Sequence, residues 1–294
     1  MLTLFSVPKP FTGPIGVIQR NAIRSWTLLG PECEILLLGD EPGTAEAAAE
    51  FGARHLPFLT RNEYGTPLLD HIFEQAEAAA TRGLMGYLNT DIILMSDFLP
   101  AVRPFQNCPQ KFLLAQQRWD VDITEPWDFT DPEWEIRLRR LTAEKGKLHN
   151  IAGLDYFIFR KGLYGKIPPF ALGRCVWDNW LLWRARDLGA ALVNLTYCVT
   201  IVHQNHDYNH VTYTPHLPGW NRIYDGPERQ RNLELAGGTA HMYDLSRATH
   251  VLRPKNGSGP AGIPPAGAGL APRGDPGFMA EKQSIPSSSG RESR

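Results

Sequence analysis

Short apolar runs separated by helix-like segments constrain the fold of this chain most. In the first 100 residues, the runs at 2–7, 34–38 and 86–95 lack the polar alternation of a half-exposed strand. Between them, the segments 14–28 and 67–81 carry apolar residues at helical spacing. Strands that are apolar on both faces and joined by helices indicate a parallel sheet covered on both sides. Such sheets bind ligands at the carboxyl ends of their strands.

The rest of the chain predicts further strands and helices and then changes in composition. Strands are expected at 111–117, 154–159, 191–195 and 199–203, helices at 134–144 and 177–188, and a polar loop at 119–133. We therefore expect one α/β domain over residues 1–252, with a first half at 1–100 and a second at 101–252. Residues 253–294 are rich in Gly, Pro and Ser, and predict a disordered tail.

Charge and cysteine content narrow the class of protein. With 30 basic and 31 acidic residues the net charge is −1, so no basic field argues for a nucleic-acid partner. The four cysteines form no C-x-x-C pair, which fits free thiols in a reducing compartment. The N-terminus has no signal-peptide pattern, and the chain has no apolar run long enough to span a bilayer. We expect a cytoplasmic protein, and peripheral contact with a membrane stays open.

The segment 86–94 (GYLNTDIIL) is the strongest candidate for a functional site. We interpret it as one continuous buried strand that Asn89, Thr90 and Asp91 interrupt. A buried carboxylate costs several kcal/mol unless it is paired or bound to a cation. Side chains alternate along a strand, so Asn89 and Asp91 would face the same side and offer two oxygen ligands to a hard cation. The alternative is that the strand ends at Leu88 and Asn-Thr-Asp forms a turn.

This element, in its place after a strand–helix series, resembles the Asp-x-Asp motif of nucleotide-diphospho-sugar transferases with the GT-A fold. The resemblance covers about residues 2–210 and implies a three-layer sandwich with a mostly parallel, mixed central sheet. It also implies that the element binds Mg²⁺ or Mn²⁺ together with the diphosphate of a sugar nucleotide, with Thr90 beside it. Asn89 replaces the first Asp and brings an oxygen without a charge, which makes Asp91 the main metal ligand.

The same resemblance places the nucleotide near the ends of the first two strands. Ser6 and Asp40 occupy those positions, and Asp40 would accept a hydrogen bond from a ribose hydroxyl or a base N–H. Asp40 could equally begin a turn or cap the next helix.

The loop before the 67–81 helix adds a second candidate contact to the nucleotide. Arg61 and Asn62 lie in it, and Thr66-Pro67 forms a plausible N-cap and first-turn pair. A helix N-terminus beside an Arg attracts phosphate. The loop could also serve only to cap the helix.

Two carboxylates in the second half are candidates for catalysis. Asp178 lies in the first turn of the 177–188 helix, where the helix dipole stabilises an anion. In inverting members of the resembled family, a carboxylate at such a helix start is the general base. Asp155 begins the 154–159 strand and would bind donor or acceptor hydroxyls. Asp178 could instead be only a cap, and the neighbouring Trp177 and Trp180 could be either a sugar-stacking wall or core residues.

Two histidines follow the last predicted strand. The resemblance implies a third metal ligand near the end of the catalytic domain, and His203 matches that position best. The sequence does not decide between His203 and His206.

Together these observations predict transfer of a sugar from a nucleoside diphosphate to a hydroxyl acceptor, a glycan or a small molecule. Two alternatives remain: a non-catalytic protein that binds nucleotide sugar, and a sugar-1-phosphate nucleotidyltransferase. The second normally carries a Gly-rich, basic signature after its first strand, which this chain lacks.

Overall fold

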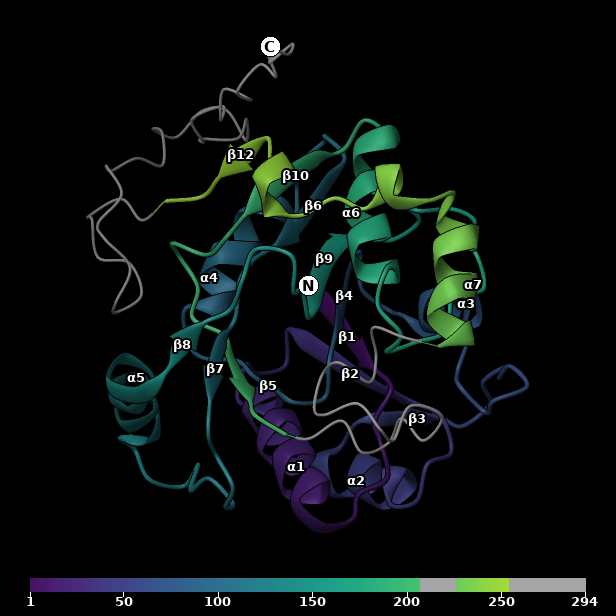
Figure 1. Ribbon diagram of the computed structural model, residues 1–294. Coiled ribbons are helices and arrows are strands. Elements are labelled where there is room, and N and C mark those ends of the chain that lie inside the picture. The colour runs from purple at the N-terminus through teal and green to yellow at the C-terminus, as the bar shows by residue number, and fades with distance from the viewer. Residues whose placement is uncertain (207–225, 254–294) are drawn as a thin grey trace, which may run out of the picture.

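The computed structural model describes residues 1–206 and 226–253, and its centre is a mixed β-sheet (Figure 1). The sheet has eight strands in the described residues, in the order β12-β10-β6-β9-β4-β1-β2-β3, and β9 alone runs antiparallel to its neighbours. The strands are β1 (Leu2–Ser6), β2 (Cys33–Leu38), β3 (Arg54–Leu56), β4 (Leu84–Leu88), β6 (Phe112–Ala115), β9 (Tyr156–Arg160), β10 (Ala191–Asn194) and β12 (His250–Val251). The predicted α/β class with a mostly parallel sheet is confirmed.

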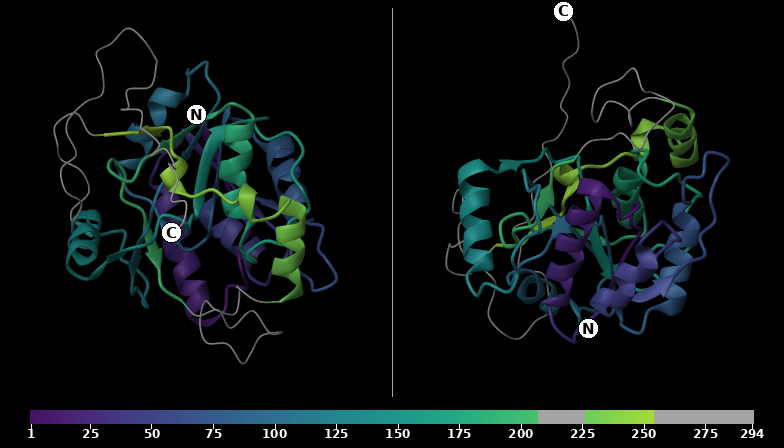
Figure 2. Two further views of the ribbon diagram at one scale, coloured as in Figure 1. Left: turned by 45° about the horizontal axis from the view of Figure 1, so that its top comes forward. Right: turned by 90° about the horizontal axis from the view of Figure 1, so that it is seen from below.

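Helices cover both faces of this sheet, which makes three layers (Figure 2). One face packs against α1 (Gly13–Thr27), α2 (Thr44–Phe51) and α4 (Phe98–Val102). The other packs against α3 (Leu69–Ala79), α6 (Trp177–Asp187) and α7 (Pro227–Ala236). Neighbouring residues of one strand serve opposite faces: Leu4 lies in the first cluster and Phe5 in the second. This two-sided burial explains why the strands read as continuous apolar runs.

A second, smaller sheet stands beside the first and was not predicted. Its order is β5-β11-β7-β8, with β5 (Ile92–Ile93), β11 (Val202–Gln204), β7 (Trp119–Val121) and β8 (Lys147–Leu148). Helix α5 (Trp134–Lys145) lies against it, to one side of the main sheet in Figure 1, and buries Leu138 there. The segment 119–133, expected to be all loop, thus begins with a strand.

The predicted continuous strand at 86–94 is wrong. Strand β4 ends at Leu88, and Asn89, Thr90 and Asp91 form a turn in which the N–H of Ile92 donates to the carbonyl of Asn89 at 3.2 Å. The apolar run resumes because Ile92 and Ile93 enter the smaller sheet, where they pair antiparallel with β11. Both halves of the run are buried, but in different sheets.

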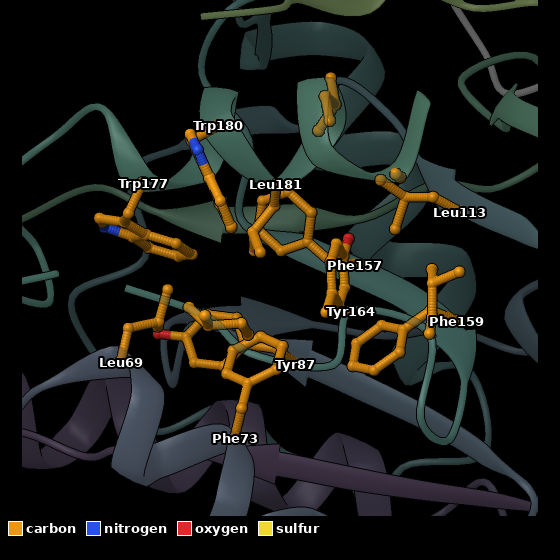
Figure 3. Packing of buried hydrophobic residues seen from close by; sticks show 14 of the residues in the cluster. Leu69, Phe73, Tyr87, Leu113, Phe157, Phe159, Tyr164, Trp177, Trp180 and Leu181 are labelled. Atoms are coloured by element: carbon orange, nitrogen blue, oxygen red, sulfur yellow. The ribbon is translucent and has the colours of Figure 1, made fainter. Parts of the chain in front are cut away.

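Aromatic side chains fill the space between the main sheet and helices α3 and α6 (Figure 3). The ring of Phe73 lies 5.1 Å from Phe5 and 5.6 Å from Phe159, centroid to centroid. Trp177 and Trp180 belong to the same cluster, with Trp177 edge-on to Tyr87 at 5.3 Å. Both tryptophans are core residues rather than a sugar-stacking wall.

No helix within residues 1–206 and 226–253 has the length and apolar character needed to cross a bilayer. All four cysteines lie in these ranges as free thiols. The tail expected at 253–294 falls, after Arg253, outside the described residues.

Replacing Phe73 by Ala tests the importance of this core. We expect the Phe73→Ala variant to lose roughly 3–5 kcal/mol in free energy of unfolding, because Phe73 is 3% exposed and the cavity cannot fully close. Phe58→Ala is the matched control, since Phe58 is 82% exposed, and should change stability by less than about 0.5 kcal/mol. Equal urea midpoints for the two variants would contradict this packing.

Candidate active site at the carboxyl edge of the sheet

Strand direction gathers polar side chains at one edge of the main sheet. Ser6 ends β1, the turn with Asp91 follows β4, and Arg118 follows β6. Asp155 comes immediately before β9, and because β9 runs in the opposite direction its start lies at this same edge. Parallel-sheet topology therefore predicts that these groups meet, as ligand sites do in such sheets.

Asp91 is largely buried and faces two histidines. Its Oδ2 lies 3.1 Å from His206 Nε2 and 3.8 Å from His203 Nε2. Its Oδ1 is buried and makes no hydrogen bond within the described part of the chain. Burial acts to raise the pKa of Asp91, but the charges of His203 and His206 hold it well below its usual range. The structure thus joins Asp91 to both histidines between which the sequence could not choose.

The spacing of these three side chains suits a small divalent cation. One ligand atom from each of Asp91, His203 and His206 lies within 4.8 Å of the other two. Ligands about 2.1 Å from such a cation lie about 3 Å apart when adjacent and about 4.2 Å apart when opposite, so a movement of roughly half an ångström would bring all three atoms into this range. The unpaired Oδ1 of Asp91 gives a cation a further oxygen in the same place. A carboxylate with two imidazoles suits Mn²⁺ better than Mg²⁺, which prefers oxygen ligands.

Asn89, the other predicted ligand from the motif, has protein partners. Its Oδ1 accepts a hydrogen bond from the Tyr87 hydroxyl at 3.1 Å, and its Nδ2 donates to Asp155 Oδ1 at 2.6 Å. Direct ligation by Asn89 stays a prediction, and its observed contacts tie the turn to the start of β9.

Behind this layer, Arg118 links two carboxylates. Its guanidinium forms an ion pair with Asp155, and its Nε donates to Asp120 Oδ1 at 2.9 Å. Asp120 Oδ2 also lies within hydrogen-bond distance of His149 Nδ1, at 2.6 Å. Burial acts to raise the pKa of Asp120, yet the hydrogen bonds from His149 and Arg118, together with the close approach of His203, hold it well below its usual range. A buried guanidinium is thus neutralised on both sides.

Asp178 occupies the predicted position in the first turn of α6. Its Oδ1 is buried without a hydrogen-bond partner among the described residues. Burial, together with the charge of Asp155, raises the pKa of Asp178 to about 7. Such a carboxyl group changes protonation near neutral pH, as a general base requires.

The hydroxyl of Tyr87 shows that the carboxylates converge. Burial raises the pKa of this phenol, and the charges of Asp91, Asp155 and Asp178 raise it further. The charges of three predicted site residues therefore act on one buried side chain at the end of β4.

The predicted nucleotide contacts form two other groups. Ser6 and Thr90 are buried, and their hydroxyl oxygens lie 2.6 Å apart, which ties the end of β1 to the motif. Asp40, with 69% of its side chain exposed, pairs with Arg61 at 2.7 Å. The Arg61 guanidinium beside it holds the pKa of Asp40 below its usual value. Nucleotide binding by these residues stays a prediction.

The loop before α3 differs in detail from its prediction. Helix α3 begins at Leu69, so Thr66 is not its N-cap. Thr66 Oγ1 instead accepts a hydrogen bond from Arg174 at 3.2 Å. Asn62 donates to Glu228 at 2.7 Å, which fastens this loop to α7.

Sequence reasoning missed Arg118, Asp120 and His149. Arg118 lies between the predicted strand at 111–117 and the predicted loop at 119–133, and Asp120 lies in that loop. No periodicity therefore showed which way their side chains point. The one available signal was position, because Arg118 follows a parallel strand at its carboxyl end.

Comparisons with known proteins give structural likenesses only. No family model and no curated sequence matches the chain. Glucosyl-3-phosphoglycerate synthase from Mycobacterium tuberculosis with Mn²⁺, UDP-glucose and phosphoglyceric acid is similar at a TM-score of 0.48 and 16% identity, over 81% of this chain and 80% of that one. Its complex with Mg²⁺ and UDP gives 0.44 and 17%, over 72% and 74%. At these values the likenesses carry no inference about activity, and the function proposed below rests on the side chains of this chain.

The pKa of Asp178 predicts a pH-dependent stability difference. A carboxyl group that titrates near 3.8 when unfolded and about 7 when folded binds its proton more tightly in the folded state. The stabilisation that Asp178 gives by binding this proton is therefore complete below about pH 4 and is lost as the pH rises through about 7.

We expect Asp178→Asn to remove this loss. The free energy of unfolding of the variant minus that of the wild type should therefore increase between pH 5 and pH 8. Urea unfolding at both pH values measures it. A difference between the two proteins that stays constant with pH would contradict the burial of this carboxyl group.

Proposed function

We propose that this chain is a glycosyltransferase that moves a sugar from a nucleoside-diphosphate sugar to a hydroxyl acceptor. The observation that carries the proposal is the approach of Asp91 to His203 and His206 at the carboxyl edge of the sheet, together with the buried Asp178, whose charge acts on the same Tyr87 hydroxyl as that of Asp91. The first group suits a cation that also binds phosphate oxygens, and the second suits removal of a proton.

Asp91, His203 and His206 would hold the divalent cation, with Asn89 as a further candidate oxygen ligand. Bound there, Mn²⁺ or Mg²⁺ would supply neutralisation of charge on the leaving diphosphate. The sugar nucleotide would extend from this edge toward the ends of β1 and β2. Ser6 and Thr90, and then Asp40, Arg61 and Asn62, are the candidate contacts in that direction.

The acceptor half of the reaction would take place at Asp178. The acceptor oxygen bonds to the anomeric carbon as the bond from that carbon to the diphosphate oxygen breaks, and the hydroxyl proton passes to the Asp178 carboxylate. The nucleoside diphosphate leaves with the bonding electrons. This assignment applies to inversion at the anomeric carbon; with retention, Asp178 would position the acceptor.

Asp155 has a different part in this proposal. Its two oxygens are used by Arg118 and Asn89, so it is fixed between the metal side and the acceptor side. We propose that it orients a hydroxyl group of the donor or the acceptor.

Turnover of a donor panel tests the function. UDP- and GDP-sugars are incubated with the protein, Mn²⁺ and a mixture of sugar and small-molecule acceptors, and release of UDP or GDP is measured. We expect release by the wild type and roughly a 100-fold loss in Asp91→Asn, because the charge of the main ligand is gone. Asp187→Asn, at the exposed end of α6, is the matched control and should retain wild-type turnover.

The same experiment separates the alternatives. Tight binding of a nucleotide sugar without turnover would favour the non-catalytic protein. Release of pyrophosphate from a nucleoside triphosphate and a sugar 1-phosphate would favour the nucleotidyltransferase. Equal turnover by the wild type and Asp91→Asn would exclude the proposed metal site.

The proposed base predicts the pH profile of the reaction. Since Asp178 accepts a proton only when ionised, kcat/KM should rise with pH and level off above about 7. In Asp178→Asn it should fall by roughly 10²–10⁴-fold and lose this rise. An unchanged profile in the variant would assign the base elsewhere.

A further inference from the structure

His203 lies between two carboxylates on opposite sides of its ring. Its Nε2 is 3.8 Å from Asp91 Oδ2, and its Nδ1 is 3.1 Å from Asp120 Oδ1, a close contact that a small rotation of the ring would turn into a hydrogen bond. The ring is buried, so these two carboxylates govern what each nitrogen can do. A carboxylate accepts a hydrogen bond from an N–H, whereas a cation needs the lone pair of a nitrogen without one.

We propose that Asp120 is a positioning residue: it holds the Nδ1–H side of His203 and thereby leaves Nε2 for the divalent cation beside Asp91. This inference rests on the metal site of the proposed function. Histidine ligands in metal sites commonly donate their second N–H to a carboxylate, which fixes the tautomer and ring orientation and raises the basicity of the ligand.

The backbone places Asp120 opposite His203. Strands β7 and β11 run parallel, and their register pairs Asp120 with His203 directly. The two side chains therefore meet because of a ladder of backbone hydrogen bonds, independently of any ligand. The pairing also explains why a short strand is present where the sequence suggested only loop.

The carboxylate of Asp120 is itself fixed by its other partners. Arg118 Nε donates to Oδ1 at 2.9 Å, and His149 Nδ1 lies 2.6 Å from Oδ2. Arg118 also pairs with Asp155. With both oxygens engaged, the carboxylate cannot rotate away from His203 without breaking a contact to a charged group, as a rigid support of a metal ligand requires.

Mn²⁺ affinity tests this role without any measurement of turnover. Titration calorimetry with Mn²⁺ alone is performed on the wild type, Asp120→Asn and Asp122→Asn. We expect Asp120→Asn to bind Mn²⁺ 10–100-fold more weakly, the usual effect of removing such a support. Asp122→Asn removes the same charge two residues away, where the exposed side chain accepts from Asn205 at 2.7 Å, and should match the wild type.

The outcomes separate this inference from the metal site itself. A wild type that does not bind Mn²⁺ overturns both. Wild-type affinity in Asp120→Asn overturns the inference alone, and an equal loss in Asp122→Asn attributes the effect to net charge and overturns it too.

A measurement on the wild-type protein needs no folded Asp120 variant. Protein labelled with ¹⁵N in histidine is loaded with diamagnetic Zn²⁺, and the signals of His203 are identified by their absence in His203→Gln. We expect a protonated Nδ1 and a metal-bound Nε2. A metal-bound Nδ1 would overturn the inference.

Discussion

A largely buried carboxylate dominates the carboxyl edge of the main sheet. Asp91 needs compensation, since an uncompensated buried charge costs several kcal/mol. The contacts that compensate it form a closed circuit. His203 and His206 face Asp91, and Asp120 lies beside His203. Arg118 joins Asp120 to Asp155, and Asp155 accepts a hydrogen bond from Asn89, two residues before Asp91. Each member is buried or nearly so, and removing one leaves its neighbour as an unpaired polar group. The site and the local stability therefore depend on the same contacts.

The circuit lies where the chain passes from the large sheet to the small one. Asn89 follows β4 and Asp155 precedes β9 in the large sheet, while Asp120 lies on β7 and His203 on β11 in the small one. The turn after Leu88 makes this crossing possible, because a strand that continued through Asp91 could not place Ile92 beside β11. The break in the apolar run is thus the structural origin of the site. The smaller sheet positions the histidines opposite the turn.

The sequence predicted the elements that are long or apolar on both faces and missed those that depend on pairing. Helix α1 spans Gly13–Thr27, close to the expected 14–28, because its apolar residues recur at helical spacing. Strands β7 and β8 have three and two residues, too short for any periodicity to show. The run at 86–94 was interpreted as one strand because apolar pattern reports burial but not which sheet buries a residue. Asp91, Asp155, Asp178 and His203 could be proposed from the sequence because of their residue type and position. Arg118 and Asp120 were missed because their partners follow from strand register between distant segments.

The central claim is that Asp91, His203 and His206 form one cation site at the edge of the sheet. The most direct measurement is a crystal structure of the protein with Mn²⁺ and a nucleoside diphosphate, with anomalous data collected at the manganese edge. We expect one strong anomalous peak from a manganese ion that is bound by Asp91, by at least one of the two histidines and by a diphosphate oxygen. A fully occupied manganese ion elsewhere, or a bound nucleotide with no peak beside Asp91 at saturating Mn²⁺, would contradict it.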